Sequence, residues 1–350
     1  MERKPLSKGQ ILLGGHRGLD VIRTKCCVLK QASLPKDITG IRNEAEKLRA
    51  LHGTGIAPEF LGEGEDYIAE QDLGDSQPIK DGEVLRQNAA RALWTLRQHR
   101  IAHGDLGYHK NMVFKDDRPI FLDWAESWYY GEPSPDSRKG ADSSMLWRTI
   151  SFMTAEMHPH PDTPRIIRRW CAVAGALGAN GQSNLLLEGK TLLDLGCFQG
   201  DFCAMAAADG MGAHGVDNGG FRSGENSIEL GRRLWAAMIS KAHIALFQSD
   251  ILDWRNFAYD AVLLFSTWAY VYRDYGEERA LQLLEDIMAQ CRVLFFETQL
   301  AGDGPGPAFL KTHEHVGAML GRFGKAEEIA RFPVSLNPSA VRSIWKVVKK

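Results

Sequence analysis

The chain has 350 residues, which exceeds an average single domain and predicts two domains, each long enough to bury a core. Its 42 lysines and arginines against 44 aspartates and glutamates give a formal net charge of -2, so no overall field favours nucleic acid or an anionic membrane. No uncharged run reaches the roughly 18 residues of a membrane span, which leaves only peripheral membrane association open. The six cysteines include no C-x-x-C pair, and no apolar segment follows the opening Met-Glu-Arg-Lys, so we expect reduced thiols and a cytoplasmic location.

A small β-rich lobe is predicted for the first part of the chain. Residues 11–18 (ILLGGHRG) are typical of a strand entering a glycine turn, and a second strand over 24–30 ends at Lys30. The apolar spacing over 39–51 predicts a helix, with Glu44 beside its buried face. A strand over 66–70 and an amphipathic helix over 84–98 follow.

Polar residues then gather in the segment IAHGDLGYHKNMV (101–113) and in PIFLDWA (119–125). Asp105 follows a His-Gly turn, Asn111 comes six residues later, and Asp123 closes a short hairpin. Two carboxylates and an amide in this order can hold Mg²⁺ and orient a hydroxyl group. Phosphoryl transfer requires these groups.

The order Lys30, Glu44, His-Gly-Asp105, Asn111 and Asp123 resembles the protein-kinase-like superfamily, in the branch that includes aminoglycoside, RIO-type and lipopolysaccharide sugar kinases. The resemblance implies an α+β bilobal fold in which Lys30 contacts the phosphates of ATP and pairs with Glu44. It also implies that Asp105 is the catalytic base. Asn111 and Asp123 would then bind Mg²⁺.

Two details of this resemblance leave alternatives open. Asn111 lies one residue later than the family pattern has it, so either the loop is longer or Lys110 takes the metal position. The glycine loop at 14–18 is only a loose match, so a pseudokinase that binds nucleotide without turnover is the alternative. The resemblance also implies that backbone groups near Glu70 and Leu73 contact the adenine ring.

The junction between the domains is predicted within 151–189, where a proline-rich run precedes a helix over 165–177 and a flexible break. Three arginines of this helix, among them Arg169, predict a basic face. The sequence does not decide to which domain the helix belongs. We place a kinase-like domain over 1–178, with lobes over 1–70 and 71–178, and a second domain over 179–350.

The block 191–202 (TLLDLGCFQGDF) combines a buried strand, a glycine turn and a helix start. Gly196 and Gly200 let the backbone turn sharply and approach a ligand, at the strand end where open α/β sheets bind ligands. Together with Asp194 and with Asp217 at the end of the next strand, the D-L-G-x-x-x-G spacing resembles the class I S-adenosylmethionine-dependent methyltransferases. The resemblance implies a Rossmann-like α/β fold, with the glycine turn against the methionine part and Asp217 on the ribose. An NAD enzyme is the alternative for such a turn.

Alternating strands and helices continue to the end of the chain, as a doubly wound sheet requires. Strands are expected over 213–217, 243–247, 259–265 and 292–297, helices over 227–241 and 277–290, and a closing antiparallel hairpin over 331–334 and 343–348. The resemblance implies that Asp250 and Ile251 contact the adenine and that Ser266 lies at the cofactor rim. An N-cap is the alternative for Asp250.

Residues after the fourth and fifth strands are candidates for acting on the methyl acceptor: Ser266, Trp268, Tyr270, Glu297 and Gln299. A general base is needed only for a protonated acceptor. A phosphate acceptor would instead be positioned by cations such as Arg222 or Arg273.

Two functional hypotheses follow from these motifs. In the first, the chain is a bifunctional transferase that uses ATP and Mg²⁺ to phosphorylate a hydroxyl and S-adenosylmethionine to methylate, plausibly on the same phosphate. This pairing resembles bacterial kinase/methyltransferases that cap O-antigen or related lipopolysaccharide glycans, with the domain order reversed. In the second, a methyltransferase acts on a small molecule or RNA and carries a regulatory pseudokinase lobe. The sequence fixes neither the acceptor nor the oligomeric state.

Overall fold

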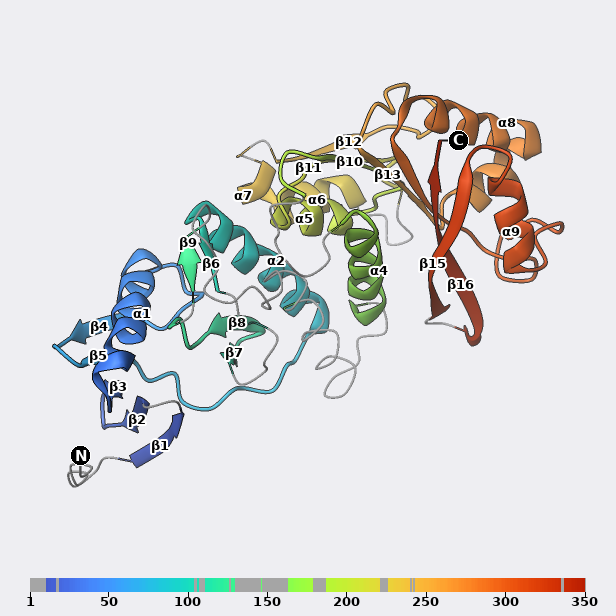
Figure 1. Ribbon diagram of the computed structural model, residues 1–350. Coiled ribbons are helices and arrows are strands. Elements are labelled where there is room, and N and C mark those ends of the chain that lie inside the picture. The colour runs from blue at the N-terminus through green and yellow to red at the C-terminus, as the bar shows by residue number, and fades with distance from the viewer. Residues whose placement is uncertain are drawn as a thin grey trace. The chain divides into compact units, whose positions relative to one another are not determined.

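The computed structural model forms two compact units, Met1–His160 and Pro161–Lys350 (Figure 1). The structure describes residues 11–16, 19–103, 106, 111–125, 127–129, 146, 163–178, 187–220, 226–239, 241, 243–334 and 337–349. None of the helices in these stretches combines the length and apolar character that a membrane crossing needs.

The first unit begins with an antiparallel sheet in the order β1-β2-β3-β5-β4. Its strands are β1 (Ile11–His16), β2 (Leu19–Arg23), β3 (Cys27–Ala32), β4 (Phe60–Glu63) and β5 (Tyr67–Gln71). A short 3₁₀ helix, η1 (Pro35–Asp37), leads into α1 (Ile38–Ala50), which packs on this sheet. The strand β2 was not predicted from the sequence.

The rest of the described first unit is mainly a helix with two small antiparallel strand pairs, of which β7–β8 is a hairpin. They are α2 (Gly82–Gln98), β6 (Ile101–Ala102), β7 (Met112–Lys115), β8 (Arg118–Phe121) and β9 (Trp128–Tyr129). Strand β7 pairs with β8, and β6 pairs with β9, both antiparallel. The apolar face of α2 is buried and packs against β8, as the sequence pattern predicts.

A seven-stranded sheet in the order β12-β11-β10-β13-β14-β16-β15 forms the centre of the second unit. Five parallel strands are β10 (Thr191–Leu195), β11 (Gly212–Asp217), β12 (Ile244–Gln248), β13 (Ala261–Phe265) and β14 (Val293–Glu297). The antiparallel pair β15 (Lys325–Val334) and β16 (Asn337–Val348) closes the sheet, so the expected alternating α/β sheet with a closing antiparallel hairpin is present. Because the strand order reverses at β10, ligands are expected at the carboxyl ends of β10 and β13.

Helices cover both faces of this sheet: α4 (Thr163–Ala176), α5 (Asp201–Ala208), α6 (Ser227–Leu234), α7 (Ala236–Ile239), α8 (Trp268–Gln290) and α9 (His313–Leu320). The helices differ from the prediction at three places. The helix expected over 227–241 is divided at Trp235, and α9 was not predicted. Helix α8 begins directly after β13 and is kinked at Gly276, whose φ of 85° and ψ of 171° are not helical.

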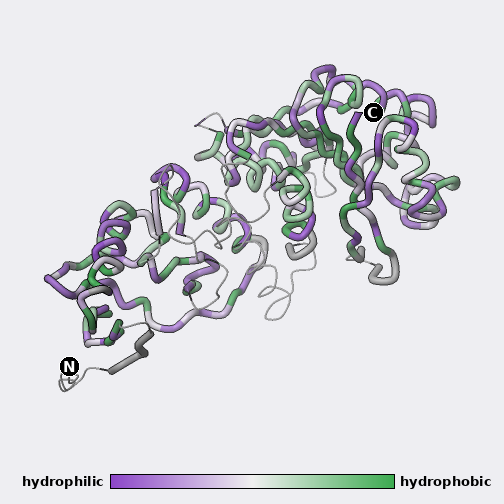
Figure 2. The backbone as a smooth tube through the Cα atoms, in the orientation of Figure 1, coloured by the Kyte–Doolittle hydropathy of each residue, from purple (hydrophilic) through white to green (hydrophobic). Residues whose placement is uncertain are grey.

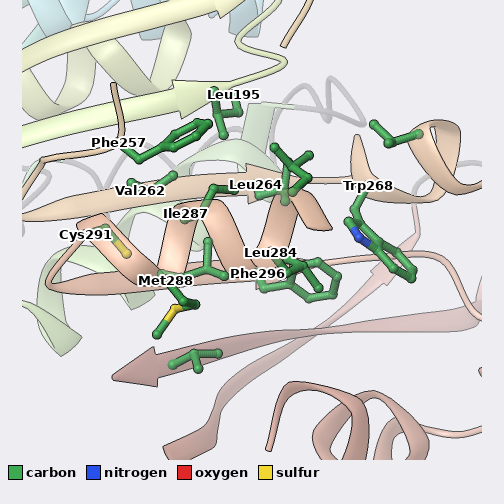
Figure 3. Close-up of a cluster of buried hydrophobic side chains, with 14 of the residues drawn as sticks. Leu195, Phe257, Val262, Leu264, Trp268, Leu284, Ile287, Met288, Cys291 and Phe296 are labelled. Carbon is green, nitrogen blue, oxygen red and sulfur yellow. The ribbon is translucent and has the colours of Figure 1, made fainter. Parts of the chain in front are cut away.

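The core lies mainly between one face of the sheet and helices α8 and α9. Alternate residues of three adjacent strands point to this face, namely Leu193, Leu195, Val262, Leu264, Leu294 and Phe296. Figure 3 shows several of them against Leu284 and Ile287 of α8. The hydropathy trace in Figure 2 is correspondingly green along the central strands. The intervening residues, among them Asp194 and Glu297, point to the opposite face.

Helix α4, which the sequence could not assign, belongs to the second unit. Trp170 Nε1 donates to Asp209 Oδ2 at 2.6 Å, and Lys346 Nζ donates to the carbonyl of Ala176 at 3.0 Å. The division between the units therefore lies before α4, at 160/161, rather than after it as the predicted boundary at 178/179 has it.

We predict that Gly276→Ala lowers the free energy of unfolding of the second unit by about 1–3 kcal/mol, because only glycine adopts its backbone angles without strain. Steric overlap would not contribute, because a Cβ at Gly276 would meet no atom within 4 Å. The control is Gly175→Ala in α4, which is equally open and helical and should be neutral or stabilise by up to about 1 kcal/mol. Urea unfolding monitored by circular dichroism measures both; equal effects would contradict the prediction.

Candidate functional site

The glycine turn after β10 packs against the start of α8. Gly196 and Gly200 have φ of 78° and 82°, a conformation that favours glycine. A Cβ at Gly196 would overlap Thr267 Oγ1, and one at Gly200 would lie 2.8 Å from Leu246 Cδ2. Gly196 therefore holds the backbone close to the start of α8, and Gly200 holds it close to β12.

Asp217, at the end of β11, lies directly against this turn. Its Oδ2 accepts a hydrogen bond from the backbone N–H of Phe198 at 3.0 Å. Its Oδ1 accepts from the N–H of Gly219 at 2.9 Å and from the hydroxyl of Ser227 at 3.3 Å. The structure thus brings together the acidic residue and the glycine turn that the sequence motif links.

Asp194 is a buried carboxyl group in the same site, with 2% of its surface exposed. Burial, followed by the nearby charges of Asp217 and Asp201, raises the pKa of Asp194 to about 8. Within the described part of the chain, Asp194 Oδ2 has no hydrogen-bond partner. A buried carboxyl oxygen without a partner fits a cationic or hydrogen-bond-donating ligand.

Of the two residues predicted to contact adenine, Asp250 is partly exposed and Ile251 is buried. Asp250 Oδ1 accepts from the N–H of Leu252 at 2.8 Å, and its Oδ2 accepts from the hydroxyl of Tyr275 at 3.1 Å. No helix starts there, so Asp250 caps a turn rather than a helix. Ile251 is buried in the hydrophobic core. Tyr275, which sequence reasoning missed, places an exposed aromatic ring beside Asp250.

The candidates for the methyl acceptor separate into core and edge residues. Trp268 is fully buried and donates to the carbonyl of Ala280 at 2.8 Å, so this candidate belongs to the core. Tyr270 is exposed, with Arg273 over its ring at 5.0 Å. Arg273 forms an ion pair with Asp274, and Arg222 lies outside the described residues.

Ser266, Glu297 and Gln299 meet at the carboxyl ends of β13 and β14. Ser266 has a left-handed φ of 60°, and its hydroxyl donates to Glu297 Oε1 at 2.8 Å. Gln299 Nε2 donates to the carbonyl of Ser266 at 3.2 Å. Glu297 is fully buried. These three predicted residues therefore form one connected group.

Two arginines complete this group, and sequence reasoning placed neither of them there. Arg169 of α4 is 4% exposed and forms a short hydrogen bond to Glu297 Oε1, so it is buried rather than part of a basic surface. Arg342 of β16 donates to Ser266 Oγ at 3.1 Å and to Asp303 Oδ2 at 2.8 Å. Only the helix periodicity could have indicated that Arg169 is buried, because it places Arg169 on the same side of α4 as Trp170.

The first unit contains a buried charged group centred on Lys30 of β3. Lys30 Nζ lies 2.5 Å from Glu44 Oε1 and 3.2 Å from Glu70 Oε1. Burial alone would lower the pKa of Lys30, but the charges of Glu44, Glu70 and Asp123 outweigh it and raise the pKa above its ordinary value. The predicted Lys30–Glu44 pair is therefore formed.

Glu70 was predicted to contribute through its backbone, whereas its side chain joins this charged group. Strands β3 and β5 pair Val28 with Glu70, so Glu70 is a diagonal neighbour of Lys30 on the sheet. Burial raises the pKa of Glu70 to about 7, although Lys30 opposes the shift. Leu73 lies beyond the end of β5, where Asp72 forms an ion pair with Arg23 at 3.0 Å.

The β7–β8 hairpin brings Asn111 and Asp123 to one end. The N–H of Leu122 donates to the carbonyl of Asn111 at 2.8 Å, which joins the residues flanking the hairpin. Asp123 is exposed with a φ of 62°, and the N–H of Trp124 donates to Glu44 Oε1 at 3.1 Å. Asp123 therefore lies beside the Lys30 group.

The remaining kinase motif residues are only partly described. Asp105 and Lys110 lie outside the described residues, whereas His103 is buried and bonded through Nε2 to the carbonyl of Leu122 at 2.8 Å. Across the described residues, no cluster of three or more histidine, cysteine, aspartate or glutamate side chains could hold a metal ion. Asn111 and Asp123, the two residues predicted to bind Mg²⁺, flank the same hairpin.

Comparison with known proteins gives structural similarity only. No protein-family model and no curated protein matches the chain. Among solved structures, it is similar to the bifunctional kinase-methyltransferase WbdD, with a TM-score of 0.41 and 17% identity over 52% of this chain and 38% of that one. It is also similar to magnesium protoporphyrin IX methyltransferase (ChlM) from Synechocystis PCC 6803 with bound SAM, with a TM-score of 0.39 and 16% identity over 52% and 79% of the two chains. The chain spans well under half the length of WbdD, and these similarities identify neither reaction nor substrate.

We predict that Asp194→Asn stabilises the protein more at pH 8 than at pH 5. Because the pKa of Asp194 is raised to about 8, the folded state keeps a proton that the unfolded state loses above about pH 4. The wild type should therefore lose stability relative to the variant by up to about 1.4 kcal/mol per pH unit across this range. Urea unfolding at several pH values measures the difference, and exposed Asp253→Asn is the control. A difference independent of pH would contradict the assignment.

Proposed function

We propose that the second unit binds S-adenosylmethionine and transfers its methyl group to an acceptor. The observation that supports this most directly is the convergence of the glycine turn with two carboxylates. Asp217 Oδ2 is bonded to the turn, and buried Asp194 Oδ2 has no partner in the described part of the chain. The donor has a cationic amino group and ribose hydroxyls, which are groups that carboxylates bind. Because the pKa of Asp194 is about 8, binding of the cation would release its proton.

The proposed binding roles follow from where each side chain lies. Asp194 would hold the cationic amino-acid part above Gly196, and Asp217 would accept hydrogen bonds from the ribose. Asp250 and the ring of Tyr275 would border the adenine. The bound sulfonium supplies an activated methyl carbon, so the task of the chain is to position and orient the acceptor at the ends of β13 and β14.

We further propose that the first unit binds ATP with Mg²⁺ and phosphorylates a hydroxyl group, with a glycan or lipopolysaccharide terminus as the substrate that the sequence resemblance implies. The formed Lys30–Glu44 pair, with Asp123 beside it, supports this proposal. Lys30 would contact phosphate oxygens, Asn111 and Asp123 would hold Mg²⁺, and Asp105 would orient the attacking hydroxyl. Methylation of the resulting phosphate is one version of the bifunctional proposal.

One observation favours the second candidate, a regulatory lobe that binds nucleotide without turnover. Lys30 is already balanced by two buried carboxylates, because Glu70 is added to the expected partner Glu44. When Glu70 is ionised, its negative charge next to Lys30 weakens the attraction of Lys30 for phosphate groups. Binding of ATP without phosphorylation of any acceptor would identify this candidate.

The methyltransferase proposal predicts that Gly196→Val abolishes measurable binding of S-adenosylmethionine, because a side chain at Gly196 would overlap Thr267. Asp217→Ala should weaken binding by about 1–3 kcal/mol through loss of a hydrogen-bonded carboxylate. Isothermal titration calorimetry measures both, with exposed Glu285→Ala as the control. Undiminished affinity in the two site variants would show that the cofactor binds elsewhere or not at all.

The kinase proposal predicts that Asp123→Ala and Lys30→Met each reduce the affinity for ATP in the presence of Mg²⁺ by at least about tenfold. Lys80→Met removes an exposed lysine of the same unit and serves as the control. Mass spectrometry of candidate glycans incubated with ATP, Mg²⁺ and S-adenosylmethionine then reads out added phosphate, added methyl or both. If Asp123→Ala leaves ATP affinity and turnover unchanged, the kinase proposal fails.

A further inference from the structure

A group of buried hydrogen-bond acceptors at the carboxyl end of β14 is not explained by cofactor binding. Glu297 Oε2 and Gln299 Oε1 are buried, and neither atom has a hydrogen-bond partner among the described residues. Both side chains are at least 97% buried, with 0% and 3% of their surfaces exposed. Buried polar atoms are normally paired, so a missing partner indicates a ligand that supplies hydrogen-bond donors.

Among the described residues, the partners of the Glu297 carboxylate all contact its other oxygen, Oε1. Arg169 and the hydroxyl of Ser266 both donate to Oε1, and Arg342 Nη1 lies 3.7 Å from the same atom. These contacts fix the orientation of the carboxylate. Two cations, Arg169 and Arg342, therefore lie beside this carboxylate.

The group lies at the same edge of the sheet as the proposed cofactor site. Leu195 pairs with Leu264 and Phe265 pairs with Glu297, so Asp194 and Glu297 point to the same face of the sheet. Strand β14 is two strands from β10, which places the two strand ends roughly 10 Å apart. Thr267, packed on Gly196, and its neighbour Ser266 bridge the distance.

We propose that Glu297 and Gln299 bind the methyl acceptor and that this acceptor is an amine. The inference rests on the proposed function of the second unit and names its substrate class. An ammonium group first gives its proton to solvent, so that the amine enters the transfer neutral. Its lone pair forms a bond to the methyl carbon while the methyl–sulfur bond breaks and its electron pair stays on sulfur. The nitrogen becomes positively charged, and the Glu297 carboxylate stabilises that charge through Oε2.

A hydroxyl or phosphate acceptor fits this arrangement less well. A hydroxyl is a much weaker acid than an ammonium group, so solvent does not remove its proton in advance and the transfer requires a general base. A phosphate needs cations aimed at it, whereas Arg169 and Arg342 are aimed at Glu297 and Asp303. Asp201 and Asp217, whose charges act on Asp194, add further negative charge to the same edge of the sheet.

Sinefungin tests the proposal without knowledge of the acceptor, because it has a primary amine where the donor has its sulfonium methyl group. S-adenosylhomocysteine has only a neutral sulfur there and is the reference ligand. Calorimetry with the full chain should give sinefungin an affinity about tenfold higher than that of S-adenosylhomocysteine. Glu297→Gln should reduce this ratio to about one while leaving the affinity for S-adenosylhomocysteine within about twofold.

Two further variants separate the proposed contact from a structural effect. Gln299→Met removes the unpaired amide oxygen at similar volume and should lower the affinity ratio about threefold. This variant still tests the proposal if Glu297→Gln does not fold. Glu328→Gln removes another arginine-paired glutamate of the same sheet and should leave the ratio unchanged.

Three results would overturn the proposal. Equal affinities of the two ligands in the wild type would show that no carboxylate faces the methyl position. Equal loss of both ligands in Glu297→Gln, with Gln299→Met unchanged in ratio, would place Glu297 at the amino-acid part of the cofactor. Inorganic phosphate that tightens binding of S-adenosylhomocysteine, with no preference for sinefungin, would indicate a phosphate acceptor. Binding of neither ligand would instead refute the proposed methyltransferase function itself.

Discussion

The buried carboxylate of Glu297 is the interaction on which the second unit's candidate site depends. An ionised group without water costs several kcal/mol unless it is paired and hydrogen-bonded. Glu297 obtains its partners from Arg169 of α4, Ser266 after β13 and Arg342 of β16, so these elements must come together at one point. The position of α4 and the backbone at Ser266 are thereby fixed relative to the glycine turn.

The first unit also buries a charged side chain, which in this case is positive. Its buried cation, Lys30, lies between Glu44 and Glu70, and the backbone of Trp124 adds a hydrogen bond to Glu44. This arrangement connects β3, α1 and β5 with the end of the β7–β8 hairpin. In both units a charge removed from water therefore joins elements that are distant in sequence, and the candidate ligand site adjoins that charge.

Strained backbone occurs next to both of these charged groups. Ser266 and Asp123 have left-handed φ values of 60° and 62°, and Phe198 in the glycine turn has 54°. Such conformations cost about 1–3 kcal/mol each for residues other than glycine and persist where surrounding contacts determine them. Each of the three adjoins a contact already described: Ser266 with Glu297, Trp124 with Glu44, and Phe198 with Asp217.

The sequence by itself determined the succession of the parallel strands along the chain and the glycine turn, because hydrophobic period and glycine spacing are local signals. The Lys30–Glu44 pair was implied only by the family resemblance. The sequence could not determine that Arg169 is buried, since its partner lies 128 residues away and an arginine on a helix looks the same whether it is solvated or paired. Nor could it show the side chain of Glu70 beside Lys30 or the kink at Gly276. Those features were decided by tertiary structure, because only packing brings distant charges together and removes the water that would otherwise separate them.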